Sequence, residues 1–488
     1  MNNVIALGAS QRKLSINRYV SEGDEQKFMK QKSKIYYISL PDEMRKEEKL
    51  AWLRETKFKD IAFERITPDA KHNWINLSDN DFDSLLPLID KDVKVGKSEE
   101  SIFKMFSSGL KTQRDEWVYD FDKDNLERKI RYFVDVYEAT RKDNDYADKM
   151  KIKWDRELDK YKDRNIIKEF SQIRIQKSLY RPYVSQNLYF DKNFIGMTYQ
   201  WNDIYKASNQ NSYIAFNALG NNKDFHCIST SSVCDLHLTG DSQCLPQFTF
   251  EANNERLENI TDWALQKFQA NYQDSNITKQ SIFHYVYAVL HNPQYRQKYE
   301  LNLKREFPRI PFYDDFRQWS AWGAKLMDLH INYESQEPYQ LKRIDIDSAQ
   351  NKKAETRPLG SVSLFDNGIT IIEESTIADT RVSASDNFVS APKTKLKADK
   401  INNTIEIDSV TTLEGIPPIA WEYKLGNRSA LEWILDQYKE RKPQDATIAE
   451  KFNTYKFADY KESVIELLKK VCTVSVETQK IIGEMLKK

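Results

Sequence analysis

The apolar residues of this 488-residue chain fall into alternating blocks of helical and strand-like spacing, and the order of these blocks limits the folds open to it. Helical spacing covers residues 125–178 and is clearest over 260–303, whereas residues 180–250 consist of short strand-like pieces rich in Tyr, Phe, Asn and Ser. Strand-like spacing returns over 345–415, and helical spacing returns over 429–488. Interleaved blocks of this kind predict an α+β fold with mixed helical and β-rich subdomains, rather than a repeating strand–helix array.

Capping signals within the helical blocks predict where single helices begin and end. Thr278 or Ser281 can begin a helix that Asn292-Pro293 ends, and a further helix is expected over 315–332. Hydroxyl side chains suit the first position because their oxygens accept hydrogen bonds from the free N–H groups of the first turn.

The remaining boundaries are set by short strands and by polar stretches. A strand is expected at 34–40, followed by a helix that Asp42 can cap and by a second strand at 61–66. A polar stretch near 380–400 interrupts the strand-like spacing. The chain is therefore expected to form five segments: 1–100, 101–258, 259–345, 346–428 and 429–488.

The charges of the chain balance, because Lys and Arg together number 74 and Asp and Glu together also number 74. This balance excludes a generic binder of polyanions, which would carry a clear basic excess. Any contact with nucleic acid must come from local patches. Residues 151–181 form one such patch, with ten basic side chains against five acidic ones, and it fits either a solvated helix face or a surface that faces phosphates.

The cysteine content and the hydropathy indicate a soluble protein of a reducing compartment. Four cysteines in 488 residues are far fewer than a secreted disulfide scaffold carries, so reduced thiols are expected. No run approaches the roughly 18 apolar residues that a membrane-spanning helix needs, and the first residues lack the apolar core of a signal peptide. We therefore expect a cytoplasmic protein.

The sequence contains no motif of the common enzyme classes. There is no phosphate-binding G-x-x-x-x-G-K-[ST] loop, no G-x-G-x-x-G, no G-x-S-x-G and no H-E-x-x-H. Five possible metal ligands lie close in sequence: His226, Cys227, Cys234, His237 and Cys244. Only Cys234-x-x-His237 has a spacing usual for zinc, so we expect buried thiols and ordinary histidines rather than a metal site.

The segment 109–114, Gly-Leu-Lys-Thr-Gln-Arg, combines a glycine with a hydroxyl and two cationic side chains. The glycine allows a backbone to approach a ligand closely, and Lys111 and Arg114 can neutralise phosphates. Arg114 can alternatively form a fork of hydrogen bonds to guanine O6 and N7. The opposite interpretation is a tight turn with solvated charges, and these residues alone do not decide between the two.

Other cationic side chains allow a similar choice. Arg181, which a proline follows, suits either a projected contact or a structural ion pair, and we favour the ion pair. Lys304, Arg305 and Arg309 can stabilise a helix end or contact a DNA backbone. Polar loops between residues 185 and 225 are the expected base readers, because Asn and Gln side chains pair with adenine.

Six segments form a distinctive ordered set: SSGLKTQRDEWVYDF (107–121), LYRPY (179–183), ENITDWALQKFQANY (258–272), ITKQSIFHYVYAVLHNPQYRQKYELNLKREFPRIPF (277–312), GIPPIAWEYKLGNRSALEWILDQY (415–438) and VCTVSVETQKI (471–481). In this order they closely resemble the C-terminal specificity region of type ISP restriction-modification enzymes. The resemblance covers residues 35–485, nearly the whole chain.

This resemblance implies a function in DNA recognition. In that family one long polypeptide joins a nuclease, a helicase-like ATPase, an N6-adenine methyltransferase and a target-recognition domain that reads an asymmetric DNA site. The chain resembles the last part alone, with its first residues similar to the exit from the methyltransferase domain. S-adenosylmethionine, ATP and Mg would therefore belong to other domains, and neither a cofactor nor a catalytic residue is expected here.

We accordingly expect sequence-specific binding of double-stranded DNA, because Gly-hydrophobe-Lys-Thr segments also open the recognition region of other adenine methyltransferases. The expected DNA-binding residues are Lys111, Thr112, Arg114, Arg181, Lys304, Arg305 and Arg309. Two alternatives stay open: an interaction subunit that docks a separate helicase–methyltransferase chain, and a truncated remnant of such an enzyme.

Overall fold

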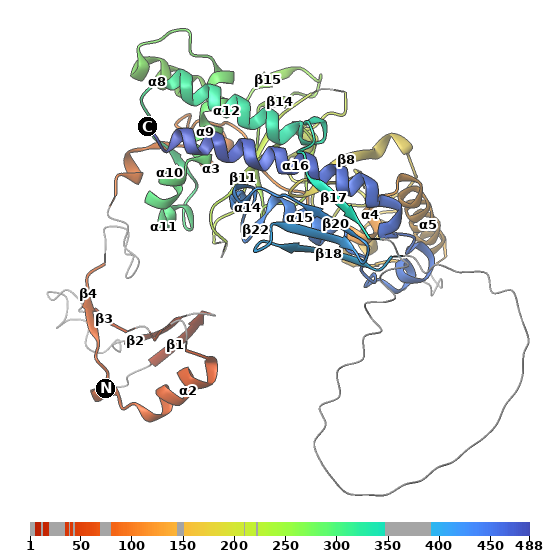
Figure 1. Ribbon diagram of the computed structural model, residues 1–488, viewed down its shortest axis with the longest axis horizontal. Helices are drawn as coiled ribbons and strands as arrows, with labels where there is room; N and C mark the ends of the chain where they lie inside the picture. Colours follow the sequence, from red (N-terminus) through yellow and green to blue (C-terminus); the bar gives the residue numbers. More distant parts are fainter. Residues whose placement is uncertain are drawn as a thin grey trace, which may run out of the picture. The chain divides into compact units, whose positions relative to one another are not determined.

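The computed structural model contains two compact units, Met1–Asn80 and Asp81–Lys488 (Figure 1). The described residues are 5–10, 13–18, 35–38, 40–41, 44–68, 80–143, 151–208, 210–220, 223–346 and 392–488. Helices and strands interleave along the chain, which confirms the predicted α+β fold. The predicted segment 1–100 spans the division between the units. Among the described helices, none has the length and apolar content needed to cross a membrane.

The small unit contains two antiparallel strand pairs, β1–β2 and β3–β4, and one helix. Its elements are β1 (Ile5–Ser10), β2 (Lys13–Arg18), β3 (Ile35–Tyr37), α2 (Lys46–Glu55) and β4 (Glu64–Ile66). Both predicted strands are confirmed, in shorter form than expected. The helix begins with the Arg45 N–H donating to the Glu48 carboxylate at 2.7 Å, and the predicted cap, Asp42, lies outside the described residues.

Two four-stranded sheets form the strand-rich part of the large unit, as predicted for residues 180–250. The first has the order β11-β10-β13-β6, with β6 (Ser107–Ser108), β10 (Tyr213–Phe216), β11 (Cys227–Thr230) and β13 (Gln243–Pro246). The second has the order β12-β8-β9-β7, with β7 (Tyr119–Asp120), β8 (Ile175–Arg181), β9 (Val184–Tyr189) and β12 (Val233–Cys234). Since β12 runs parallel to β8, residues 233–234 lie beside Ser178 and Leu179.

The helical region between residues 260 and 332 is confirmed, including its predicted boundaries. Its helices are α8 (Asp262–Tyr272), α9 (Lys279–His291), α10 (Pro293–Lys298), α11 (Glu300–Leu303) and α12 (Phe316–Ile331). Thr278 and Ser281 together cap α9, which ends before Asn292. The helices α9 and α12 pack closely enough that a Cβ added at Gly323 would lie 1.8 Å from the carbonyl oxygen of His284.

The third part of the large unit is a C-terminal sheet with two helices. The sheet has the order β17-β20-β19-β18, with β17 (Lys342–Asp345), β18 (Thr394–Asp399), β19 (Thr404–Asp408) and β20 (Thr411–Glu414). The helices are α15 (Ala430–Gln437) and α16 (Phe457–Met485). The polar stretch near 380–400 was expected to interrupt the strand spacing, and this is wrong from residue 394 onward, because 394–399 form β18. Residues 347–391 lie outside the described part.

Shorter elements and two longer helices complete the large unit. They are β5 (Leu86–Pro87), α3 (Lys91–Lys94), α4 (Asp115–Val118), α5 (Lys123–Lys142), α6 (Arg156–Asp163), α7 (Trp201–Ile204), β14 (Phe248–Phe250), β15 (Arg256–Glu258), β16 (Arg309–Ile310), α14 (Pro418–Glu422), β21 (Lys424–Leu425) and β22 (Arg428–Ser429).

Two hydrophobic cores stabilise the large unit. The first joins the second sheet, the C-terminal sheet, α5 and α15, and the other contains α8–α12. The first sheet contributes residues to both. Helix α16 contributes to both, with Leu468 and Val471 in the first core and Ile481 and Met485 in the second. Figure 1 shows α16 running from beside α12 toward the C-terminal sheet. One helix therefore links both cores.

Candidate nucleic-acid interface

Three segments that are distant in sequence meet in the large unit: 109–113, 195–199 and 234–241. The N–H of Leu110 donates to the carbonyl of Cys234 at 2.9 Å, and the N–H of Leu236 donates to the carbonyl of Leu110 at 2.9 Å. On the other side, the backbones of Lys111 and Met197 exchange two hydrogen bonds of 2.9 and 3.1 Å. Segment 109–113 is thus the middle one, and we call the three together the three-segment face.

Gly109 brings the middle segment against the neighbouring backbone. A Cβ at this position would lie 2.5 Å from the carbonyl oxygen of Asp235 and 2.7 Å from the Cα of Leu236. The Gly109 N–H also donates to the carbonyl of Ser242 at 2.9 Å. The expected close approach of this glycine to a ligand is therefore corrected, because the close contact is internal to the protein.

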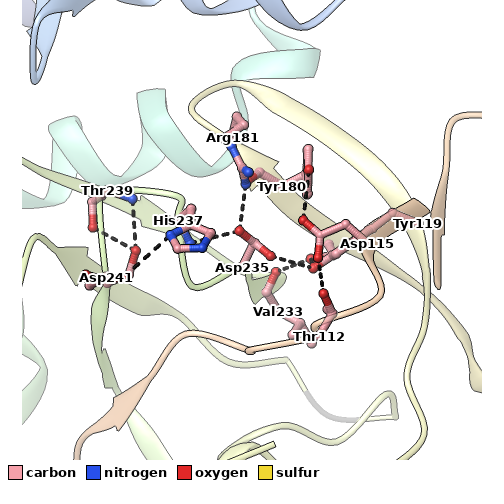
Figure 2. A network of polar contacts seen from close by, with 12 residues as sticks. Thr112, Asp115, Tyr119, Tyr180, Arg181, Val233, Asp235, His237, Thr239 and Asp241 are labelled. Carbon is pink, nitrogen blue, oxygen red and sulfur yellow. Dashed lines mark hydrogen bonds and ion pairs between the residues drawn. The ribbon is translucent and has the colours of Figure 1, made fainter. Parts of the chain in front are cut away.

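A buried polar network supports the three-segment face (Figure 2). The carboxylate of Asp235 is 2% exposed, and it accepts hydrogen bonds from Arg181 Nη1 at 2.6 Å and from the His237 N–H at 2.8 Å. The hydroxyl of Tyr119 donates to its other oxygen at 3.4 Å. Burial raises the pKa of Asp235 to about 6, although the Arg181 charge opposes the rise. The pairing of Asp235 with Arg181 anchors segment 234–241 to the end of β8.

Thr112 takes part in the same network from the middle segment. Its hydroxyl donates to the carboxylate of Asp115, the first residue of α4, and the hydroxyl of Tyr180 donates to that carboxylate at 3.1 Å. Figure 2 shows both donors converging on Asp115. Thr112 is 2% exposed. Its burial argues against the predicted DNA contact, because the hydroxyl is occupied inside the protein.

Arg114 lies in the core, although it was expected to contact DNA. It is 1% exposed, its Nη1 donates to the carbonyl of Phe194 at 3.2 Å, and its guanidinium pairs with Asp155. The ring of Phe133 lies 5.9 Å from the guanidinium carbon. The expectation of a DNA contact is therefore corrected, because a buried guanidinium offers no surface to a phosphate or a base. The other interpretation, solvated charges on a turn, does not hold for Arg114 either, because its ion-pair partner Asp155 lies 41 positions away in the sequence and the side chain is buried.

Arg181 likewise acts as a structural residue, as the sequence favoured. Its guanidinium lies 3.9 Å from the ring centre of Tyr180 and pairs with Asp235 at 2.6 Å. Its side chain is 14% exposed. This double engagement argues against the predicted DNA contact of Arg181, since both the charge and the flat face of the guanidinium are already used.

The three cationic side chains predicted to cluster after α11 have different positions: one holds two strands together and two lie at the surface. Arg309 Nη1 donates to the carbonyl of Leu85 at 3.2 Å, so it fastens β16 beside β5. Lys304 pairs with Glu300 at 2.5 Å, and its side chain is 37% exposed. Arg305 is exposed. Lys304 and Arg305 thus lie at the surface, whereas the Arg309 side chain positions a strand.

The exposed side chains of the three-segment face alternate with the buried ones. Lys111 and Gln113 are exposed, whereas Thr112 and Arg114 between and after them are buried. Met197 is 47% and Tyr199 is 39% exposed, and the His237 side chain is 59% exposed. Sequence reasoning does not single out Gln113, although it lies within segment 109–114. An amide, an aromatic ring and a cation are therefore exposed on the three segments.

The loops between residues 185 and 225, expected to read bases, use several of their amides internally. Asn211 donates to the carbonyls of Ile204 and Phe248 at 2.9 and 2.8 Å, and Asn217 accepts from the His226 N–H at 2.9 Å. These two asparagines are buried. Within this range, the exposed candidates on the three-segment face are Met197 and Tyr199.

The possible metal ligands do not converge. In the described part of the chain, no group of three or more His, Cys, Asp or Glu side chains is arranged to hold a metal ion. Cys234 is buried, whereas the exposed His237 lies 3.5 Å from Asp241. Burial raises the pKa of Cys227 to about 11 and lowers the pKa of His226 to about 4. All four cysteines are buried free thiols, as predicted.

Comparisons with known proteins give one family model and several similar structures. The family model described as the type ISP C-terminal specificity domain matches residues 101–467. The structure of a DrdV–DNA complex is 42% identical over 93% of this chain, with a TM-score of 0.79, and the match covers 43% of that chain. A search of curated proteins finds no match.

Two further solved structures are type ISP restriction-modification enzymes. A nuclease-deletion mutant of LlaGI in complex with a DNA substrate mimic is 25% identical over 96% of this chain, with a TM-score of 0.72. The ATP-dependent enzyme LlaBIII bound to DNA is 25% identical over 87% of this chain, with a TM-score of 0.68. The matches cover 40% and 25% of those chains, so this chain spans less than half of the length of any of the three.

Proposed function

Because the chain belongs to the family of type ISP C-terminal specificity domains, we propose that it recognises a specific sequence in double-stranded DNA. In this role it is the target-recognition part of a type ISP restriction-modification system. The observation that carries the proposal is the three-segment face, where exposed polar and aromatic side chains stand on a buried ionic network. The DNA-bound state of the three similar structures supports the same function.

The chemistry of the face suits such recognition. Lys111 is exposed, and no hydrogen bond or ion pair engages its ammonium group among the described residues, so it can neutralise a phosphate. Lys304 and Arg305 offer a second cationic position, with Lys304 partly engaged by Glu300. The backbone links the two regions, because Ala218 N–H donates to Gly240 O at 3.4 Å and Gly220 N–H donates to Lys304 O at 3.0 Å. Local cations can thus act although the net charge is zero.

Selection from random duplexes tests the proposal. The 488-residue chain is expected to enrich one sequence motif, and its affinity should fall with salt by a slope of several phosphate contacts. A competitor of random sequence should displace the selected duplex only at large excess. If the chain enriches no sequence and binds no duplex even at low salt, the proposed function is wrong.

We further propose that the remaining activities of the system come from parts outside this sequence, on the same or on a separate chain. These activities are an ATP-dependent helicase, a nuclease and an N6-adenine methyltransferase. The ATP dependence of the similar enzyme LlaBIII supports the first of them. Such a system would act in the cytoplasm, with S-adenosylmethionine, ATP and Mg bound by those parts. Purification of the tagged chain from its native cells tests this, because a longer chain or a co-purifying ATPase and methyltransferase is expected. A preparation that contains this chain alone contradicts it.

A further inference from the structure

We propose that Gln113 reads an adenine of the DNA target, and that Gly196 positions its amide for this contact. The proposal rests on the proposed DNA recognition and deepens it by naming one reading position. It comes from three observations: the backbone conformation of Gln113, the space beside it, and the free state of its amide.

The backbone places Gln113 at the tip of the middle segment. Its φ is 61°, in the left-handed region that residues other than Gly, Asn and Asp rarely adopt. The residues on both sides are fixed, because Thr112 donates to Asp115 and Arg114 pairs with Asp155. Both neighbours are buried, whereas Gln113 is exposed. The tip is therefore held rigidly, and only one side chain points outward from it.

Gly196 gives the Gln113 side chain a defined place. A Cβ added at Gly196 would lie 2.8 Å from both Cδ and Oε1 of Gln113, so the amide lies directly over this glycine. The Gly196 N–H donates to the carbonyl of Thr112 at 3.1 Å, which fixes the two segments relative to each other. The glycine thus provides the room in which the amide rests.

The amide itself has no partner in the described structure, although most polar groups around it do. Local stability alone would favour Gly or Asn in this left-handed position, because both adopt it more readily than Gln. A residue that departs from the local preference and gains no internal hydrogen bond is a candidate for function. The glutamine amide offers a donor and an acceptor side by side, which match N7 and N6 of adenine in the major groove. Lys111, two residues earlier, is placed to contact the adjacent backbone.

Substitutions that tolerate the left-handed backbone separate reading from structure. Gln113→Asn keeps an amide and is expected to keep the preference for adenine at one position of the selected motif. Gln113→Gly removes the amide and should lower that preference about 5- to 150-fold, while the melting temperature stays the same or rises. Gln113→Arg should shift the preference at the same position toward guanine. Gly196→Ala should lower it as well, since its Cβ displaces the end of a flexible side chain.

Gln273→Gly is the matched control. Gln273 is also an exposed glutamine with a left-handed backbone, at φ 52°, but it follows α8 and has no part in the three-segment face. Its substitution should leave the selected motif unchanged. The salt slope should stay the same in all five variants except Gln113→Arg, which adds a charge.

The outcomes distinguish this proposal from the proposed function. If the unchanged chain selects a motif and Gln113→Gly selects the same one, DNA recognition stands and the reading role of Gln113 is wrong. A uniform loss of affinity for all sequences in Gln113→Gly also overturns that role, because it indicates a backbone contact. If the unchanged chain selects no motif, both proposals fail.

Discussion

At the scale of single residues, Arg114 shows that a cation in a polar motif can belong to the core. Arg114→Ala would leave Asp155 without its partner and remove the hydrogen bond to Phe194, so we expect a loss of about 3 kcal/mol in the free energy of unfolding. Urea denaturation measures this loss. Arg131→Ala is the control, since the Arg131 side chain is 56% exposed and its pair with Glu127 should contribute less than about 1 kcal/mol. If Arg114→Ala unfolds like the unchanged chain but binds DNA weakly, the expectation that Arg114 contacts DNA would be right after all.

Lys111, three residues earlier, is the opposite case. Its exposed ammonium group should contact one phosphate, so Lys111→Ala is expected to weaken binding to all sequences and to reduce the salt slope by about one. Titration of a labelled duplex at several salt concentrations measures both effects. Lys439→Ala, another exposed lysine, should change neither. An altered sequence preference in Lys111→Ala would show instead that the side chain reads a base.

At the scale of secondary-structure elements, the contact between α9 and α12 depends on one glycine. Gly323→Ala would force the two backbones apart, because the added Cβ would lie 1.8 Å from the His284 carbonyl oxygen, and we expect a loss of about 2 kcal/mol or more. Gly483→Ala is matched to it, as a helical glycine of α16 with no atom within 4 Å of the added Cβ. It should stabilise the chain by about 0.5–1 kcal/mol. Chemical denaturation of both variants measures the two changes in the free energy of unfolding. Changes of the same sign in both variants would contradict the prediction.

The elements that the sequence predicts well are those whose boundaries are set locally. The cap of α9 is built from Thr278 and Ser281, three residues apart, so local spacing is enough to find it. Strand β18 was not predicted because its lysines make the segment look polar. Leu396 is the one side chain of this strand that is deeply buried, so there is no alternation of apolar residues to find. Its pairing with β19 is a tertiary property that composition does not reveal.

The candidate site was predictable as a segment but not residue by residue. The mixture of glycine, cations and polar side chains in 109–114 singles out the middle segment of the three-segment face, and its role in DNA binding stays a prediction. The burial of Arg114, however, depends on Asp155, which α5 separates from it in the chain. The position of the Gln113 amide depends on Gly196, which belongs to a segment that is distant in sequence and is joined to the middle segment by the Lys111–Met197 bridge. Such contacts arise only when the chain has folded, so sequence spacing cannot assign them.

At the scale of the whole molecule, buried histidines make the stability depend on pH. Burial lowers the pKa of His226 to about 4 and that of His330 to about 3, and it also lowers the pKa of His291. The unfolded chain takes up protons near pH 6.5, and the folded chain does so only at lower pH. The free energy of unfolding should therefore fall as the pH decreases from about 6.5 to 4, by up to about 1.4 kcal/mol per pH unit for each histidine.

Unfolding in urea at pH 7.5, 6.0 and 5.0 measures this dependence. His330→Gln should have a smaller pH slope than the unchanged chain, although it is less stable throughout because the bond to Tyr287 is weakened. His237→Gln should keep the full slope, since His237 is exposed. An equal slope in His330→Gln and the unchanged chain would show that His330 does not contribute.

The position of α16 in both cores has a consequence for how the protein is made. Residues 457–485 supply side chains to both hydrophobic clusters of the large unit, so neither cluster is complete until this stretch has emerged from the ribosome. The α9–α12 pair and the strand-rich sheets are synthesised earlier and must wait with part of their apolar surface uncovered. Biosynthesis thus imposes a delay between the synthesis of the three-segment face and the completion of the cores that support it, and the apolar surface exposed in this interval is of the kind that nascent-chain chaperones bind.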